Sequence, residues 1–498
     1  MEEIMYLGGI DIGSTGCKIK VYDDQGNYVY RAYRDYPVER SAGEHEVDGT
    51  ALWEKVQEVI ADAAEKYPLR AIGISSFGES CVLLDEADQP LLPVMLYTDP
   101  RGVEECQELT EKVGREKIRR LTGVDPHSMY SLPKLMWIRK NRPDVWKQVR
   151  HILMMEDYVI YMLTGNAVID YSLAARSMAF DIRKLCWAQE MFAAAGVDSS
   201  LFSMPVVNGS AAGTVKPDMA EKLGLTEETL IIPVGHDQVA ATIGSGVFDE
   251  ETGVDGAGTV ECIIPIYDGI PEGDTMYENG YAVVPYVVPG KYVTYAFSFT
   301  GGALVSWFIN NLAKGELEES RRQGISVYEL LEKDMKNDPT GILVLPHFAG
   351  AGTPYMDEGS KGAILGLTVE HTASDLYRAM MEGVVYEMMI NQEKLMEAGI
   401  RPKRLLATGG GAASEVWMQM KADMLQIPVT SLENADAGAA ASAIMAGVAA
   451  GVFADQKSAA AVFVKERKTY YPRQDMYEKY RKHYERYKKV YGAVRELV

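Results

Sequence analysis

Two short segments of this chain combine glycine, a hydroxyl residue and an apolar strand in one repeated pattern. Gly13-Ser14 and Gly258-Thr259 stand 245 positions apart, and each pair is followed at identical spacing by a cysteine, two β-branched residues and Tyr-Asp. The pattern predicts a duplicated β-hairpin whose tight turn offers backbone N–H groups and a hydroxyl to an anion. Two such turns could hold a polyphosphate, which makes phosphate chemistry the first hypothesis. The alternative is two unrelated hairpins that are alike by accident.

A carboxylate placed to accept a proton would complete this chemistry. Transfer of a phosphoryl group to an alcohol needs a positioned hydroxyl, a proton acceptor and stabilisation of charge on the phosphate oxygens. Asp237 follows a buried-looking strand at 230–234 and a glycine, so we expect its carboxylate at a strand end, near the start of the next helix. The N-terminus of that helix would keep the carboxylate ionised. A helix N-cap is the alternative role for this residue.

The two hairpins differ at one position that bears on metal binding. Asp11 of the first hairpin corresponds to Gly256 of the second. A Mg²⁺ ion needs a carboxylate or waters that a carboxylate fixes, and it typically keeps several waters. Of the two turns, only the first therefore offers a group suited to a divalent ion.

The elements that must position these residues alternate between strands and helices. We expect strands at 5–11, 17–23, 71–74 and 82–84. A strand at 404–408 leads into the glycine run 409–412 and a helix, where a ligand can approach the backbone closely; a simple tight turn is the alternative. A long helix capped by Ser374 precedes that strand. The Ala- and Gly-rich stretch 439–453 is predicted as a buried helix, because it is shorter than the ~20 residues that a membrane span needs.

Length and composition narrow the remaining possibilities. A chain of 498 residues suggests two large domains, and we expect residues 1–249 to form one and residues 250–498 the other. The net charge of −21 argues against a general nucleic-acid surface. Five scattered cysteines without a CxxC pair fit a reducing compartment and no zinc site. Because the start also lacks a signal sequence, we expect a cytoplasmic protein.

With these elements in order, the chain resembles the FGGY family of carbohydrate kinases, a branch of the actin/hexokinase superfold, over nearly its whole length. The resemblance implies an α/β fold of two actin-like ATPase (ribonuclease H-like) domains, each a mixed five-stranded sheet flanked by helices, with ATP and the sugar in the cleft between them. It also explains the duplicated hairpin, since the two halves of the family share that core. The matching segments are Gly9-Ile10-Asp11-Ile12-Gly13-Ser14-Thr15, Gly235-His236-Asp237-Gln238, Gly258-Thr259, Gly409-Gly410-Gly411-Ala412 with Trp417-Met418-Gln419 and Ala422-Asp423, Pro428-Val429, Glu433 and Gly438-Ala439-Ala440.

The resemblance implies roles for single residues as well. The N-terminal domain would bind the sugar and carry Asp237 as the catalytic base, with Asp11 at the Mg²⁺ position. The C-terminal domain would bind the adenine nucleotide. The implied ATP contacts are Gly13, Ser14, Thr15 and Lys18 on one side and Gly258, Thr259, Gly302, Ser306, Gly410, Gly411 and Ala412 on the other. The implied sugar contacts are Glu79, Tyr97, Asp99 and Gln238.

Several of these assignments have alternatives. Lys18 could be an exposed strand residue, as most lysines are. Each of the four sugar contacts could also be a surface residue of its loop, and for Tyr97 and Asp99 the two interpretations are equally favoured. At Ser306 some relatives carry glutamine. The residue types nevertheless suit a polyol, because carboxylates and an amide accept hydrogen bonds from several hydroxyls and an aromatic ring covers the carbon skeleton.

Departures from the family's patterns leave the substrate open. Gly78 stands where glycerol kinases usually place arginine, and Phe77-Gly78-Glu79 stands where xylulokinases usually show Met-His-Gly. The run Gly258-Thr259-Val260-Glu261 is closer to the L-fuculose kinase-like branch. The sequence therefore supports an ATP-dependent kinase of a small ketose or polyol, similar to xylulose, fuculose or ribulose. A glycerol or gluconate kinase of the same family is the alternative.

A protein of another class remains a competing hypothesis. Other members of the superfold bind nucleotides as sensors or scaffolds without transferring phosphate. Asp237 discriminates between the two, because a scaffold has no need of a carboxylate beside Gln238. We expect a small sugar or polyol and Mg²⁺-ATP as ligands, no nucleic acid and no membrane, with a homodimer left open.

Overall fold

The computed structural model describes residues 4–41, 43–333, 335–433 and 436–498, and these form two compact units. Unit 1 comprises residues 1–248, 282–293 and 436–464, and unit 2 comprises residues 249–281, 294–435 and 465–498, with the gaps given above. The first segment of unit 1 ends at Phe248. The chain then crosses between units more often than two continuous halves would require.

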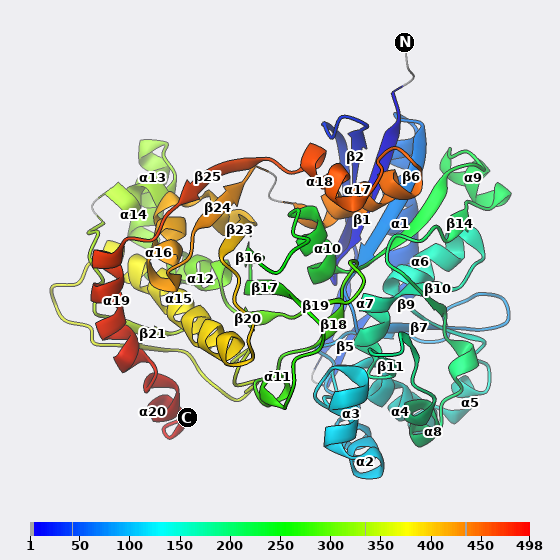
Figure 1. Ribbon diagram of the computed structural model, residues 1–498, viewed down its shortest axis with the longest axis horizontal. Helices are drawn as coiled ribbons and strands as arrows, with labels where there is room; N and C mark the ends of the chain where they lie inside the picture. Colours follow the sequence, from blue (N-terminus) through cyan, green and yellow to red (C-terminus); the bar gives the residue numbers. More distant parts are fainter. Residues whose placement is uncertain (1–3, 42, 334, 434–435) are drawn as a thin grey trace. The chain divides into compact units, whose positions relative to one another are not determined.

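Unit 1 is built on a mixed sheet with strand order β14-β15-β6-β1-β2-β3 (Figure 1). Strands β15, β6 and β1 are parallel, whereas β2, β3 and β14 run antiparallel to their neighbours. The sheet thus has six strands, where five are expected; the two-residue β14 at the edge is the shortest. The bounds are β1 Tyr6–Ile12, β2 Gly16–Asp23, β3 Tyr28–Asp35, β6 Leu69–Ser76, β14 Gly213–Thr214 and β15 Leu230–His236.

Smaller strand groups and helices complete unit 1. The strands are β4 Val38–Ser41, β5 Glu44–Val47 and β8 Val94–Met95; β7 Cys81–Leu84 with β9 His151–Met154; β10 Val168–Asp170 with β13 Met204–Val206; β11 Phe180–Asp181 with β12 Cys186–Trp187; and β18 Val284–Pro285 with β19 Lys291–Val293. The helices are α1 Gly49–Ala64, α2 Val103–Val113, α3 Arg115–Thr122, α4 Ser131–Asn141, α5 Pro143–Trp146, α6 Met155–Thr164, α7 Tyr171–Ala174, α8 Gln189–Ala195, α9 Pro217–Leu223, α10 Asp237–Gly244, α17 Ala437–Ala449 and α18 Gln456–Phe463.

Helix α17 explains why unit 1 takes in a late segment of the chain. It is the predicted Ala- and Gly-rich buried helix, and its small side chains let it lie directly against glycines of the first sheet. A Cβ added at Gly9 would stand 2.0 Å from the carbonyl oxygen of Ala439, and one added at Gly73 would stand 2.0 Å from that of Ser442. Ser442 Oγ also donates to the Ile10 carbonyl at 3.0 Å. The expectation that residues 250–498 form one continuous domain is corrected by this packing.

Unit 2 repeats the hairpin arrangement of unit 1. Strands β16 and β17 pair antiparallel, β16 runs parallel to β23, and β23 runs parallel to β24, just as β1 pairs with β2 and runs parallel to β6. The outer strands β20 and β25 pair antiparallel with β17 and β24. Both predicted hairpins therefore form. The bounds are β16 Thr252–Ala257, β17 Glu261–Asp268, β20 Ala296–Ser298, β23 Arg404–Thr408, β24 Val429–Leu432 and β25 Glu466–Tyr470, with β21 Leu343–Leu345 and β22 Ala363–Leu365 as a separate pair.

The helices of unit 2 include one whose start differs from the sequence-based expectation. Helix α15, Ala373–Glu397, is capped by Thr372 and not by Ser374, because Thr372 and Asp375 form a reciprocal capping box. The other helices are α11 Thr275–Glu278, α12 Gly302–Leu312, α13 Lys314–Gln323, α14 Val327–Lys333, α16 Glu415–Leu425, α19 Gln474–Tyr487 and α20 Val490–Arg495.

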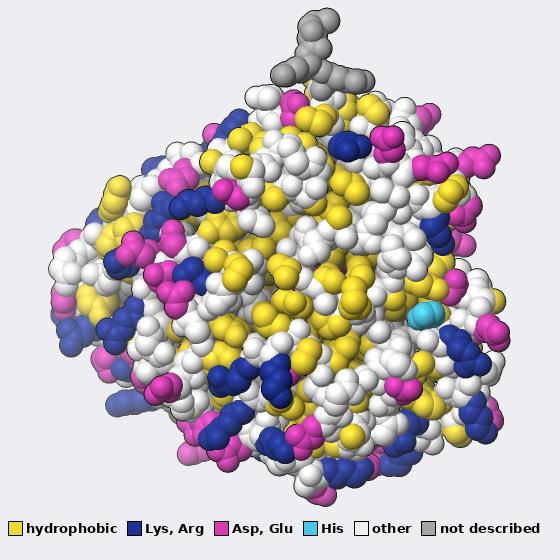
Figure 2. Space-filling model, turned by 45° about the vertical axis from the view of Figure 1, so that its right-hand side comes forward, with side chains coloured by type: hydrophobic (Ala, Val, Ile, Leu, Met, Phe, Trp, Pro, Cys, Tyr) yellow, Lys and Arg dark blue, Asp and Glu magenta, His cyan; other side chains and the backbone are white. Residues whose placement is uncertain are grey.

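The surface carries charges of both signs. On the face shown in Figure 2, acidic side chains lie among the basic ones. Over the full sequence, 71 Asp and Glu residues outnumber 50 Lys and Arg residues, which gives the net charge of −21. Among the described residues, no helix is both long and apolar enough to cross a bilayer.

Candidate functional site

The topology of unit 1 brings three predicted segments to one edge of its sheet. Because β15, β6 and β1 are parallel neighbours, their C-terminal ends lie side by side. Asp237 follows β15, Glu79 lies in the loop after β6, and Gly13 begins the turn after β1. Ligands of open α/β sheets bind outside the carboxyl ends of the strands, so this edge is the candidate site.

Asp237 occupies the first turn of α10, as the sequence predicts, and its side chain is 35% exposed. The surrounding protein partly desolvates the carboxyl group, and the charges of Asp11 and Glu79 add to the effect, so that the pKa of Asp237 rises to about 7. The helix N-terminus therefore does not dominate its ionisation, contrary to our expectation. Near neutral pH the group exchanges readily between its two protonation states, as a general base requires.

His236 lies beside this carboxylate, with Nε2 3.3 Å from Asp237 Oδ1. Burial, and then the charge of Arg176, hold the pKa of His236 well below its usual range. The imidazole is therefore neutral near pH 7 and adds no full positive charge to the site.

The turn of the first hairpin holds its backbone by local bonds. Gly13 N–H donates to the Gly16 carbonyl at 2.9 Å, and Tyr36 contributes its hydroxyl to the Gly13 carbonyl and its N–H to the Thr15 carbonyl. Ser14 is half-buried and Thr15 is exposed. Both hydroxyls thus belong to a turn whose backbone is fixed.

Lys18 forms a cluster with two carboxylates at the base of this turn. It faces Asp11 across the β1–β2 pair, and its Nζ lies 2.8 Å from Asp11 Oδ2 and 2.9 Å from Asp436 Oδ1. Burial alone would lower the pKa of Lys18, but the two carboxylates raise it. The alternative of an exposed lysine is therefore wrong. Asp436, just before α17, was not identified from the sequence because its partners lie more than 400 positions away.

Glu79 lies in a buried ion pair that the sequence did not reveal. Its Oε1 accepts from Arg176 Nε at 2.6 Å and lies 2.5 Å from a terminal guanidinium nitrogen of Arg176. Both side chains are buried. A Cβ at Gly78 would stand 2.9 Å from His236 Cδ2 and 3.1 Å from Arg176 Cγ. Position 78 thus leaves no room for a side chain, because Arg176 and His236 fill the adjoining space.

Tyr97 joins this group, whereas Asp99 does not. Partial burial of Tyr97, together with the charges of Glu79 and Asp237, raises the pKa of its phenol. The carboxylate of Asp99 is buried and accepts bonds from the backbone of His45 at 2.8 Å and from Arg101 Nε at 2.8 Å. Its expected role as a sugar contact is corrected, because these bonds assign Asp99 to holding its loop.

Gln238 follows Asp237 in the first turn of α10 and is half-buried. Its role as a sugar contact stays a prediction. Its carbonyl accepts the hydroxyl of Thr242 at 2.8 Å.

In unit 2 the second hairpin turn packs against the start of α12. Gly301 N–H donates to the Thr259 carbonyl at 2.9 Å, and Gly302 N–H donates to the Gly258 carbonyl at 2.8 Å. A Cβ at Gly302 would stand 2.8 Å from that Gly258 oxygen. Ser306 lies one turn further along α12 and is exposed. The structure thus brings Gly258, Thr259 and Gly302 together, with Ser306 on the same helix.

The glycine run after β23 approaches the same hairpin. A Cβ at Gly409 would stand 2.6 Å from the Ala257 carbonyl oxygen, and one at Gly411 would stand 3.0 Å from Ala257 Cβ and Trp417 Cζ3. Gly410 differs, because an added Cβ would meet no described atom within 4 Å. The side chain of Ala412 is buried, so only its backbone could contact a ligand. Gly410 is therefore the exposed, open position of this run.

A buried triad anchors the second hairpin. Lys421 of α16 donates to Asp255 of β16 at 2.7 and 2.9 Å and to Glu261 at the start of β17. The three side chains are at most 1% exposed. The triad was not found from the sequence, since its members read as ordinary strand and helix residues. It fixes the strands on both sides of the Gly258-Thr259 turn.

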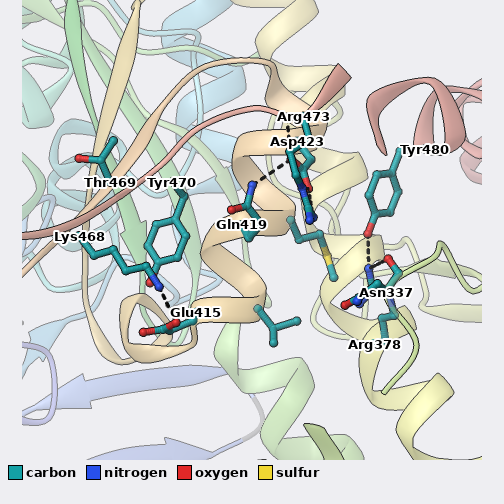
Figure 3. Close-up of a pocket in the computed structure, with 12 residues that line it drawn as sticks. Asn337, Arg378, Glu415, Gln419, Asp423, Lys468, Thr469, Tyr470, Arg473 and Tyr480 are labelled. Carbon is teal, nitrogen blue, oxygen red and sulfur yellow. Dashed lines mark hydrogen bonds and ion pairs between the residues drawn. The ribbon is translucent and has the colours of Figure 1, made fainter. Parts of the chain in front are cut away.

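Unit 2 also contains a separate cavity of about 300 Å³ (Figure 3). It lies between α15, α16, β25 and α19, and none of the predicted site residues lines it. Its basic side chains have acidic partners: Arg473 pairs with Asp423, Lys468 with Glu415, and Arg378 with Glu382. We therefore assign no ligand to this cavity.

Comparison with known proteins relates this chain to a family. The N-terminal domain of the "FGGY family of carbohydrate kinases" matches residues 5–244, and its C-terminal domain matches residues 275–450. The chain is 26% identical to a xylulose kinase of Lactococcus lactis, covering 92% of this chain and 91% of that protein. It is 26% identical to a gluconokinase of Bacillus licheniformis, covering 96% of this chain and 94% of that protein.

Solved structures show the same fold. The crystal structure of a gluconate kinase from Lactobacillus acidophilus superimposes with a TM-score of 0.88 at 24% identity, covering 99% of this chain and 98% of that chain. The two domain matches together span most of the sequence. The chain belongs to the FGGY family of carbohydrate kinases.

Proposed function

We propose that this carbohydrate kinase transfers the γ-phosphoryl group of ATP to a hydroxyl of a small ketose, with Asp237 as the proton acceptor. The observation that carries the proposal is the placement of Asp237 at the strand end shared with Glu79 and the Gly13 turn, with a pKa of about 7. The carboxylate would orient the substrate hydroxyl and take its proton as the bond to phosphorus forms.

The pairing of Glu79 with Arg176 supports a neutral sugar. A guanidinium whose charge is matched by a buried carboxylate adds no net charge to the pocket. An aldonate would need an additional cation for its carboxylate, whereas a ketose needs only acceptors and donors for its hydroxyls. Glu79, Tyr97 and Gln238 supply these groups. A neutral ketose is therefore favoured over gluconate.

The first hairpin suits a Mg²⁺ ion. Asp11 already attracts a cation, because the ammonium of Lys18 lies 2.8 Å from its carboxylate. Among the described residues, no group of three or more His, Cys, Asp or Glu side chains is placed to hold a metal. A Mg²⁺ ion would thus rely on Asp11, waters and phosphate oxygens, and when bound it would neutralise phosphate charge. Asp436 would remain as a partner of Lys18.

Unit 2 would bind the nucleotide. The backbone N–H groups and hydroxyl of the Gly258-Thr259 turn suit phosphate oxygens, and the open position at Gly410 leaves room for a flat ring against the backbone. Gly302, Ser306, Gly411 and the backbone of Ala412 complete the proposed set. We place the reaction in the cytoplasm, because Cys17, Cys81, Cys106 and Cys186 are free thiols and fit a reducing compartment.

A panel of acceptors tests this function. Purified protein with Mg²⁺-ATP would be assayed for ADP release with ketopentoses, deoxyketohexoses, polyols and aldonates. We expect turnover with at least one ketose, and weaker turnover with aldonates. Turnover with aldonates alone would overturn the ketose assignment. No turnover across the panel, with ATP binding intact, would favour the sensor or scaffold hypothesis.

A further inference from the structure

Strand β15 contains a β-bulge directly before the proposed base. Pro233 pairs with Ile74 and Gly235 with Ser75, so Val234 is an extra residue on this strand. A bulge disrupts the ladder and re-aims the chain that follows it. Its backbone N–H groups then need other partners, because unpaired buried donors are costly.

One side chain supplies partners for two of these N–H groups. Glu156 of α6 accepts from Val234 N–H at 2.8 Å and from Gly235 N–H at 2.6 Å, both through Oε1. The Glu156 side chain is fully buried. It therefore fixes the bulge from an element that is remote in sequence.

A second layer holds the next residue. Ser172 Oγ accepts from His236 N–H at 3.1 Å and donates to Asp170 Oδ1 at 2.5 Å. Asn208 Nδ2 donates to the same Asp170 oxygen at 2.7 Å and to the Val234 carbonyl at 2.9 Å. Three successive N–H groups before Asp237 are thus bound by buried side chains.

Close packing makes the arrangement specific. Gly235 has a φ of +132°, and a Cβ there would stand 2.5 Å from Ser172 Oγ and 2.8 Å from Asn208 Nδ2. The backbone can approach these side chains only because residue 235 is glycine. The position of the bulge is therefore defined by both shape and hydrogen bonding.

The two acids of the network, Glu156 and Asp170, are both fully buried. Burial, followed by the proximity of Asp170, raises the pKa of Glu156 well above its usual range. Asp170 accepts bonds from Ser172 and Asn208 and from the Leu173 backbone, which favour its charged form. In its protonated form Glu156 still accepts both N–H groups through Oε1. In that state Glu156 has one acceptor oxygen and one donor, as glutamine does.

We propose that Glu156 is a positioning residue for phosphoryl transfer, which together with Asp170, Ser172 and Asn208 fixes the bulged backbone that aims Asp237. The inference rests on the proposed role of Asp237 as the base. Loss of Glu156 would leave two buried N–H groups without an acceptor and let the Asp237 backbone shift. Small displacements of a catalytic group are costly, since about 1 Å can reduce the rate of the chemical step 100-fold.

Three variants of the full-length protein test this proposal: Glu156→Gln, Glu156→Ala and the matched control Asp157→Ala. Asp157 is the next residue of α6, is equally buried, and bonds Ser203 instead of the bulge. We expect kcat of Glu156→Gln within about 3-fold of wild type and that of Glu156→Ala reduced about 30- to 100-fold, with KM for ATP nearly unchanged. Asp157→Ala should keep kcat within about 3-fold.

Hydrogen exchange gives a readout that needs no substrate. The amides of Val234 and Gly235 should exchange at least about 10-fold faster in Glu156→Ala and at the wild-type rate in Glu156→Gln. Equal losses of kcat in Glu156→Ala and Asp157→Ala, or a Glu156→Gln variant as impaired as Glu156→Ala, would overturn the proposal. If Glu156→Ala does not fold, Ser172→Ala replaces it, and its kcat should fall while KM for ATP stays constant.

The exchange measurement separates this proposal from the proposed function. If wild-type protein shows no turnover but Glu156→Ala loses amide protection, the bulge assignment stands and the kinase assignment fails. If turnover is present and the amides of both Glu156 variants exchange as in wild type, the positioning proposal fails alone.

Discussion

At the scale of single residues, the chemistry depends on how charges are paired. Asp237 has no full positive charge bound to it, and the neighbouring carboxylates of Asp11 and Glu79 raise its pKa. Glu79 itself is bound to Arg176, and Asp11 to Lys18. Of these three carboxylates, Asp237 is the one to which no described Lys or Arg side chain is bound.

The pKa of Asp237 predicts how activity depends on pH. A general base must be deprotonated, so kcat/KM for the sugar should rise with pH and level off above an apparent pKa near 7. Rates across a pH series at fixed ionic strength would measure this. A profile that is flat between about pH 5 and 8 would contradict the assignment, because an unperturbed carboxyl titrates near 4.

Arg176 gives a second prediction at this scale. Arg176→Met would leave the Glu79 carboxylate buried without its partner, which should lower the free energy of unfolding by about 3 kcal/mol. KM for the sugar should rise at least about 10-fold, whereas KM for ATP should change little, because the pair belongs to the sugar side. Urea unfolding and steady-state kinetics would measure both effects. Arg101→Met, which removes the partner of Asp99, serves as a control whose sugar KM should stay near wild type.

At the scale of elements, glycines determine how closely backbones approach. Gly9 and Gly73 admit helix α17 onto the first sheet, and Gly302 admits α12 onto the second hairpin turn. Gly410 differs from these, because its missing side chain faces open space. Packing therefore explains the first three glycines, and Gly410 stays a predicted nucleotide contact.

This contrast predicts different outcomes for two neighbouring substitutions. In Gly410→Ala the new Cβ would meet no described atom within 4 Å, so the melting temperature should stay unchanged. If the nucleotide lies against this position, the added methyl group should raise KM for ATP at least about 5-fold. In Gly411→Ala the new Cβ would stand 3.0 Å from Ala257 Cβ and Trp417 Cζ3. This crowding should lower the free energy of unfolding by about 1–3 kcal/mol. Calorimetry with ATP kinetics would separate the two. An unchanged ATP KM in Gly410→Ala would remove this residue from the nucleotide site.

Local sequence patterns predicted the parts of this architecture that depend on neighbouring residues. Alternating apolar residues around Gly13 and Gly258 indicated both hairpins, and the strand before Asp237 placed it at a helix start. Patterns could not reveal Arg176 or Glu156, because each acts through a partner at least 78 positions away. They also could not show that Asp99 accepts the backbone N–H of His45, 54 positions away.

At the scale of the whole molecule, duplication and asymmetry divide the proposed tasks. Each unit carries a hairpin followed by a parallel strand, but Asp11, Asp237 and the Glu79–Arg176 pair all belong to unit 1. Unit 2 supplies glycine-rich backbone and the Lys421 triad that holds its hairpin. The chemistry is thus proposed to reside in unit 1 and adenine-nucleotide binding in unit 2.

The most direct test of this account is ADP release by Asp237→Ala with the acceptor that the panel identifies, measured alongside ATP binding by calorimetry. We predict that the variant binds ATP within about 3-fold of the wild-type affinity and loses at least about 1,000-fold in kcat. Turnover within about 10-fold of wild type would contradict the central claim that Asp237 is the base.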